Sequence, residues 1–118
     1  MVGAAYLDAS AITKLFIPEN DSEIAEGIIY SFDEVFTSRV SMVEVQRAIV
    51  LFYLGDDRDS WISNFRRWLE DAAVIEISRD IANLATAQAL VGSDLTFVTF
   101  DKKQGKFAEL IGMRVQGC

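Results

Sequence analysis

Three aspartates in this sequence each follow a short run of apolar residues. Asp8 comes after "AAYL", Asp80 after "VIEISR" and Asp101 after "TFVTF", while Glu44 lies in a helix-like stretch after "VFTS". If the apolar runs form parallel strands, their carboxyl ends meet at one edge of the sheet, where ligands bind in this class of fold. The sequence therefore predicts that four carboxylates face one region.

Carboxylates gathered in this way predict a site for a hard divalent cation. They repel one another unless a cation neutralises them, and Mg²⁺ or Mn²⁺ prefers oxygen ligands of this kind. Such an ion polarises a phosphoryl oxygen and lowers the pKa of a bound water, so that hydroxide can attack phosphorus. The chain contains no histidine, and this chemistry needs none.

A simpler explanation is that the aspartates only cap helices. Asp at the start of a helix accepts backbone N–H bonds, and each such cap is worth about 1 kcal/mol. Glu44 does not fit this explanation, because it lies inside its helix between the apolar residues Met42 and Val45. A solvent-exposed helix face would account for it instead.

The composition predicts one domain spanning residues 1–118. The chain has a net charge of −7 and is 51% hydrophobic, as in an ordinary globular protein. The only cysteine is Cys118, so an intrachain disulfide is excluded and a reducing cytoplasm is the expected location. The first apolar run is too short for a signal peptide or a membrane span. The negative charge argues against broad binding to a phosphate backbone.

Short apolar runs alternate with helical periodicities along the chain. Strands are predicted at 4–7, 34–38, 73–77, 95–100 and 113–115, and helices at 9–16, 21–31, 42–52, 61–69, 79–91 and 102–110, with a turn at "GDDRDS" before residue 61. Near-continuous apolar strands separated by helices indicate a sheet buried on both faces. We therefore predict an α/β fold with three layers, α/β/α, around a mostly parallel sheet of four to five strands.

Four segments resemble, in order, the motifs of PIN-domain ribonucleases, and most closely the VapC-like toxins of bacterial toxin–antitoxin pairs. They are "YLDASAITKLF", "VFTSRVSMVEVQRA", "DIANLATAQAL" and "FVTFDKKQGKFAELIGMRV", which together span nearly the whole chain. The resemblance implies an endoribonuclease that depends on Mg²⁺ or Mn²⁺. It also implies an RNA substrate, a homodimer and an antitoxin protein as inhibitory partner.

The resemblance also assigns roles to individual residues. It places the catalytic, metal-binding acids on Asp8, Glu44, Asp80 and Asp101, and a supporting hydroxyl on Thr99. Ser38 and Arg39 fall near the mouth of the cleft, although a helix cap and a surface charge would explain them equally well. The basic residues nearest in sequence to the acids would contact RNA phosphates or serve only solubility: Lys14, Arg47, Lys102 and Lys103.

The chain is shortened between its third strand and the helix at 79–91, where the family usually has a further helix. Two placements of Asp80 follow. It either opens the helix that carries the family's third acid and faces the same edge as Asp8, or it belongs to a remnant of the missing helix and points to solvent.

An aromatic stripe at helical spacing, formed by Trp61, Phe65 and Trp68, is explained either by core packing or by a surface for a partner helix. Two other functions also remain open. The chain resembles other Mg²⁺-dependent phosphotransfer or phosphatase domains in its strand-end aspartates, but these usually carry Asp-x-Asp, whereas "LDAS" has one acid. A shortened PIN domain that binds its antitoxin without cleaving RNA is the other alternative.

Overall fold

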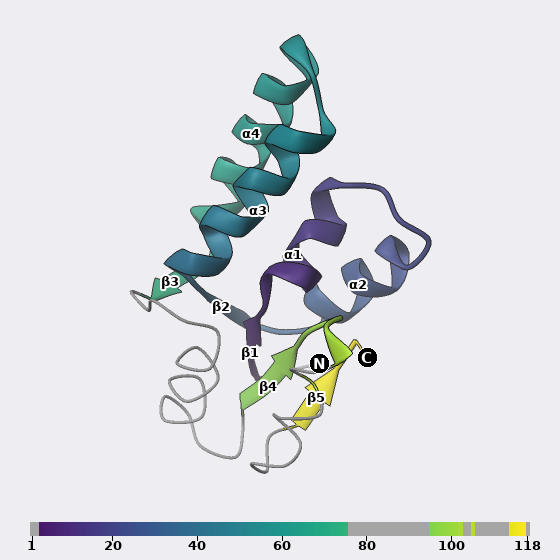
Figure 1. Cartoon of the computed structure of the whole chain (residues 1–118). Coiled ribbons are helices and arrows are strands. Elements are labelled where there is room, and N and C mark those ends of the chain that lie inside the picture. Colours follow the sequence, from purple (N-terminus) through teal and green to yellow (C-terminus); the bar gives the residue numbers. More distant parts are fainter. Residues whose placement is uncertain (1–2, 76–94, 103–104, 106–113, 118) are drawn as a thin grey trace.

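The structure is a computed structural model that describes residues 3–75, 95–102, 105 and 114–117. Within these residues the chain forms five strands and four helices (Figure 1). The strands are β1 (Ala4–Leu7), β2 (Glu34–Ser38), β3 (Ala73–Ile75), β4 (Leu95–Val98) and β5 (Arg114–Gln116). The helices are α1 (Ala9–Phe16), α2 (Ser22–Ile29), α3 (Arg39–Phe52) and α4 (Gly55–Leu69).

The five strands form one sheet in the order β3-β2-β1-β4-β5, and every pair of neighbours is parallel. Ala5, Tyr6 and Leu7 of the central strand β1 are all fully buried. Successive side chains of a strand point to opposite faces, so both faces of β1 are covered. The predicted α/β fold with a parallel sheet buried on both faces is confirmed.

The strand order changes direction at β1. The chain moves from β1 outward through β2 to β3, and then returns to the other side of β1 to form β4 and β5. In open parallel sheets, ligands bind at the carboxyl ends of the strands where the order reverses. The carboxyl ends of β1 and β4 therefore mark the expected binding crevice.

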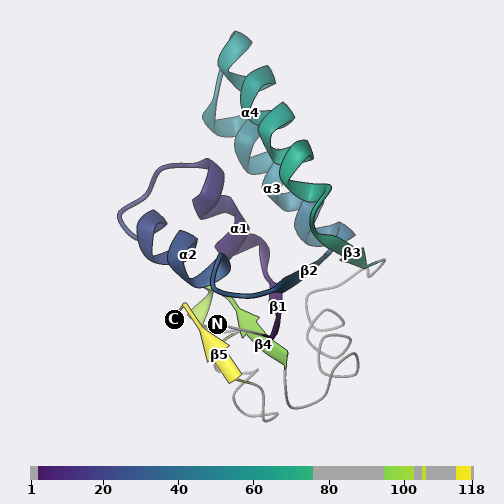
Figure 2. The ribbon, with the colours of Figure 1, turned by 180° about the vertical axis from the view of Figure 1, so that it is seen from behind.

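The helices form two pairs. α1 and α2 lie close to the sheet, whereas α3 and α4 form a hairpin that projects away from it, as the two opposite views show (Figures 1 and 2). One apolar cluster joins the two helix pairs to the sheet. Its buried members include Leu7, Ile12, Phe16, Val45, Ile49, Phe65 and Val98.

The start of α4 differs from the sequence prediction. The "GDDRDS" stretch was predicted as a turn, but α4 begins at Gly55 and includes it. Gly55 supplies a positive φ of 58° where the chain reverses from α3. Asp56 and Asp57 lie in the first turn of α4, where negative charge interacts favourably with the helix dipole. The prediction treated these residues only as turn formers, and it was wrong.

Two predicted helices lie largely outside the described residues. For 102–110, Lys102 and Gly105 are helical, and the Gly105 N–H donates to the Asp101 carbonyl over 2.9 Å. The helix at 79–91, the shortened segment before it and Asp80 all lie outside the described residues. Among the helices that the structure describes, none is long and apolar enough to cross a membrane.

Candidate active site

Asp8 connects β1 to α1 at the carboxyl edge of the sheet. Its backbone N–H donates to the Val98 carbonyl of β4 over 2.9 Å, which fixes it beside the end of that strand. Its side chain caps α1, with Oδ2 accepting from the Ser10 N–H over 3.3 Å. The capping role considered from the sequence is therefore real. Helix capping does not require burial, however, and Asp8 is only 5% exposed, so capping alone does not explain its position.

Two hydroxyl groups also donate to the same oxygen of Asp8. Ser10 Oγ lies 2.7 Å and Thr99 Oγ1 3.1 Å from Oδ2. The two hydroxyl oxygens are themselves 3.1 Å apart. These three bonds all end on Oδ2 and fix the orientation of the carboxylate.

The pKa of Asp8 is raised above its ordinary value of 3.8. Burial is the largest cause, because it disfavours the charged form, and it outweighs the hydrogen bonds from Ser10, Thr99 and the backbone amides. A nearby cation would reverse this balance by stabilising the carboxylate. A buried, destabilised carboxylate at a ligand-binding edge is typical of a functional site.

Ser10 and Thr99 tie the end of β4 to the start of α1. The Phe100 N–H donates to Ser10 Oγ over 2.8 Å, and the Asp101 N–H donates to Thr99 Oγ1 over 3.0 Å. The Thr99 N–H in turn donates to the Gln116 carbonyl of β5 over 3.1 Å. Thr99, which the resemblance named as a supporting hydroxyl, lies beside Asp8, and its role at a metal site stays a prediction. Ser10 was missed, because its partners Thr99 and Phe100 are about 90 residues away in the sequence.

The other predicted acids lie on neighbouring elements. Asp101 follows β4 and is exposed, and Glu44 is exposed in the second turn of α3. Within the described residues, no three acidic side chains lie close enough together to hold a metal ion. The four-carboxylate metal site remains a prediction, since Asp80 is outside this part of the chain.

Ser38 and Arg39 form the junction between β2 and α3. Ser38 is buried and caps α3, because its Oγ accepts from the Ser41 N–H over 3.1 Å. Arg39 is the first residue of α3 and is exposed. Both residues lie at the carboxyl end of β2, beside β1, which is the same edge of the sheet as Asp8.

The predicted basic residues differ in their surroundings. Arg47 and Lys102 are exposed. Lys14 makes two ion pairs, with Glu19 and Asp21, and its side chain is only 10% exposed. Because two carboxylates hold its ammonium group, Lys14 is poorly placed to contact an RNA phosphate.

The donor set at this edge fits a hard divalent ion. Asp8 offers a carboxylate oxygen in a buried position, and the neighbouring groups are hydroxyls, which are also hard oxygen donors. Asp101 after β4 and Glu44 on α3 are exposed carboxylates of the same chemical kind, but within the described residues they do not form a three-acid cluster with Asp8. These residues would suit Mg²⁺ or Mn²⁺ rather than a softer metal such as zinc.

The aromatic stripe of α4 packs partly into the core, and its role as a surface for a partner helix stays a prediction. Phe65 is fully buried and packs edge-on against Phe16, with ring centroids 5.3 Å apart. Trp61 is half-buried and stacks on Tyr53. Trp68 is also half-buried, and it lines a hollow of about 380 Å³ between α1, α2 and α4. This hollow, here called the α4 groove, is lined by Leu15, Phe16, Glu26, Tyr30, Asn64, Arg67, Trp68 and Asp71.

Comparison with known proteins identifies the family. The crystal structure of FitAcB from Neisseria gonorrhoeae has the same fold, with a TM-score of 0.65 over 94% of this chain and 95% of that chain, at 15% sequence identity. No curated protein sequence matches the chain. The sequence model of the PIN domain matches residues 5–92, well over half of the chain. The chain therefore belongs to the PIN-domain family.

Proposed function

We propose that this protein is a metal-dependent endoribonuclease and the toxin of a toxin–antitoxin pair. Membership of the PIN-domain family supports nuclease chemistry, and the resemblance to VapC-like toxins supports RNA as the substrate. One observation carries the proposal furthest. Asp8 is a buried carboxylate at the point where the strand order reverses, held through one oxygen by two hydroxyls.

The proposed ligands of Mg²⁺ or Mn²⁺ are Asp8, Glu44, Asp80 and Asp101. When bound there, the ion would supply a Lewis acid and an activated water for attack on a phosphodiester. Ser10 and Thr99 orient Asp8 by donating to Oδ2, which fixes the direction of Oδ1. Arg39 and Lys102, both exposed, are the proposed contacts for RNA phosphates.

The test compares RNA cleavage by wild type, Asp8→Asn and Asp59→Asn. Asn caps a helix as well as Asp does, so Asp8→Asn should keep the fold while removing a metal ligand. We expect cleavage of single-stranded RNA by wild type in Mg²⁺ or Mn²⁺, a loss of about 100-fold or more in Asp8→Asn, and no activity in EDTA. Asp59 is exposed on α4, and its variant should cleave like wild type. Cleavage at full rate in chelator would contradict the proposal.

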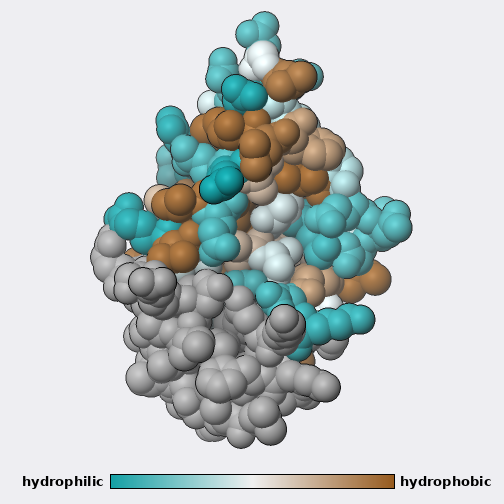
Figure 3. All heavy atoms as spheres, viewed as in Figure 1, coloured by the Kyte–Doolittle hydropathy of each residue, from teal (hydrophilic) through white to brown (hydrophobic). Residues whose placement is uncertain are grey.

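An antitoxin, a homodimer and a cytoplasmic location complete the proposal. The α4 groove supports a protein partner, because its lining combines the apolar side chains Leu15, Phe16 and Trp68 with charged side chains of both signs, Glu26, Arg67 and Asp71. Exposed apolar side chains supply further surface for association. They gather on α3 and just beyond its end (Figure 3), at Val43, Leu51, Phe52 and Leu54.

A second candidate function is antitoxin binding without cleavage. It is favoured by the absence of a three-acid cluster within the described residues. Calorimetric titration of wild type with Mn²⁺ distinguishes the two functions. Binding that disappears in Asp8→Asn supports the nuclease, whereas no binding by wild type together with intact antitoxin binding supports the second candidate.

A further inference from the structure

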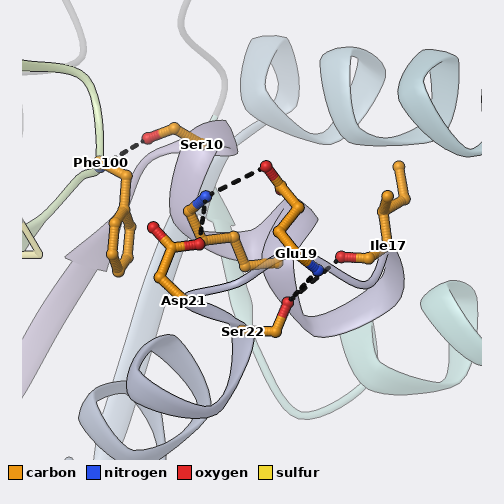
Figure 4. A network of polar contacts seen from close by, with 7 residues as sticks. Ser10, Ile17, Glu19, Asp21, Ser22 and Phe100 are labelled. Carbon is orange, nitrogen blue, oxygen red and sulfur yellow. Dashed lines mark hydrogen bonds and ion pairs between the residues drawn. The ribbon is translucent and has the colours of Figure 1, made fainter.

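Lys14 is enclosed by groups of this chain. Its Nζ lies 2.8 Å from Asp21 Oδ1 and 3.4 Å from Glu19 Oε1 (Figure 4). These two acids are 39% and 45% exposed, so the lysine is the least exposed member of the group. Two carboxylates around one ammonium leave a net negative charge, which would repel a phosphate.

The same amine also contacts the segment that carries the candidate active site. Lys14 Nζ lies 4.9 Å from the centre of the Phe100 ring. This is within the range of about 6 Å over which a cation is attracted to an aromatic face. Phe100 separates Thr99, which donates to Asp8, from Asp101.

Two residues of α1 contact Phe100. Ser10 and Lys14 are four residues apart in α1, so they lie on the same face of the helix. Ser10 Oγ accepts from the Phe100 N–H over 2.8 Å, and Lys14 contacts the Phe100 ring. The same Ser10 hydroxyl donates to Asp8 Oδ2 over 2.7 Å. A shift of Phe100 would therefore disturb the hydrogen bonds that fix Asp8.

We propose that Lys14 is a positioning residue of the candidate active site. Held by Glu19 and Asp21, it keeps the Phe100 ring against α1 and so keeps Thr99 and Asp101 in register with Asp8. Its effect on cleavage rests on the proposed nuclease function. Its effect on Phe100 does not depend on that function and can be measured directly.

The first measurement is amide hydrogen exchange at Phe100 in wild type, Lys14→Met and Lys14→Arg. Methionine keeps an unbranched side chain without the charge, whereas arginine can form the ion pairs and stack on the ring. We expect exchange to quicken by roughly tenfold in Lys14→Met, as when a stabilising contact of this kind is lost, and to return toward wild type in Lys14→Arg. Arg66→Met, which removes an exposed charge from α4, is the control. Unchanged exchange in Lys14→Met would overturn the proposal, whether or not the protein cleaves RNA.

The second measurement separates positioning from RNA binding. A positioning role predicts that Lys14→Met lowers kcat and raises the Mg²⁺ concentration needed for activity, with little change in KM for RNA. A phosphate contact predicts a higher KM and a salt dependence weaker by about one charge. The latter pair of results would overturn the proposal.

Substitution of the two acids that pair with Lys14 distinguishes a positioning role from RNA binding most clearly. In Glu19→Gln/Asp21→Asn the amine is released. If it positions Phe100, this variant should behave like Lys14→Met, with faster exchange and lower kcat. If it binds RNA, releasing it should lower KM and leave exchange at Phe100 unchanged, which would contradict the proposal. Glu23→Gln/Glu70→Gln removes two exposed carboxylates elsewhere and controls for the change in net charge.

Discussion

At the scale of single residues, Asp8 serves two needs that conflict. It caps α1 and would bind a metal, yet its burial disfavours the charge that both roles use. Ser10 and Thr99 offset part of this penalty with hydrogen bonds, and the raised pKa shows that the offset is incomplete. The folded protein therefore carries a carboxylate that is less stable in its ionised form than it would be in the unfolded chain.

This conflict predicts how stability depends on pH. A carboxyl group whose pKa is raised by folding contributes stability below its unfolded value of 3.8, and this contribution is lost as the pH rises through the folded pKa. We expect Asp8→Asn to melt at a higher temperature than wild type at neutral pH in EDTA, with the difference vanishing at acid pH. Thermal melts across the pH range test this.

The control for this prediction is the same series with Asp59→Asn, which alters an exposed side chain. Added Mg²⁺ should raise the melting temperature of wild type and not that of Asp8→Asn, because only an intact site is stabilised by its ligand. A variant less stable than wild type at neutral pH would mean that the charged cap outweighs the cost of burial.

The sequence located part of this site. Asp8 was predicted because it follows an apolar strand, whereas Thr99 was predicted only from the resemblance to PIN-domain ribonucleases. Ser10 could not be assigned its role, because a serine in a first helical turn is common and its partners Thr99 and Phe100 are about 90 residues away. The contact of Lys14 with Phe100 was missed for the same reason, since it depends on how β4 is placed.

At the scale of elements, α4 shows how one helix can serve both the core and a surface. Its buried face carries Phe65, and one turn further on Trp68 lines the α4 groove. The two rings stack with centroids 6.4 Å apart. The start of this helix was missed because glycine and aspartate favour turns and also helix starts, and only packing against α3 decides between them.

The two positions on α4 should respond differently to truncation. Phe65→Ala should lower the free energy of unfolding by about 3–5 kcal/mol, because it opens a cavity in the core. Trp68→Ala should cost less stability and weaken binding of the cognate antitoxin by about 2 kcal/mol or more, because a half-buried tryptophan in a groove is typical of a binding hot spot. Denaturant melts and calorimetry on both variants provide the comparison. Equal losses of stability with unaffected binding would make Trp68 a core residue.

Gly117, the residue after β5, lies against the backbone of Thr99 in the candidate site. This residue has a φ of +105°, and a Cβ added there would lie 2.5 Å from the Thr99 carbonyl oxygen. We expect Gly117→Ala to cost about 1–3 kcal/mol of stability through backbone strain. It should also lower the cleavage rate, because Thr99 must move and its hydroxyl donates to Asp8.

Gly27→Ala is the matched control for this substitution. Gly27 lies within α2, and a Cβ there would meet nothing within 4 Å. That variant should gain about 0.5–1 kcal/mol, because alanine favours a helix over glycine. Urea melts and RNA cleavage by both variants test the contrast. Normal cleavage by a destabilised Gly117→Ala would show that the packing of Gly117 against Thr99 does not affect activity.

At the scale of the whole molecule, the sequence predicted the sheet better than the relations between distant parts. The bounds of β1, α1 and β2 agree with the apolar runs and periodicity, because parallel strands buried on both faces leave a strong local pattern. The projection of the α3–α4 hairpin and the α4 groove had no such pattern. They arise from contacts between elements, which a single sequence does not display.

The position of β1 in the sheet also has a consequence for synthesis. β1, β2 and β3 are adjacent and come from the first part of the chain, so they can pair as soon as residue 75 has left the ribosome. The bond from Thr99 to Asp8 spans 91 residues, and it cannot form until β4 has been added to the other side of β1. Until residues 95–99 have been made, the nascent chain therefore carries Asp8 without the Thr99 hydroxyl that donates to it.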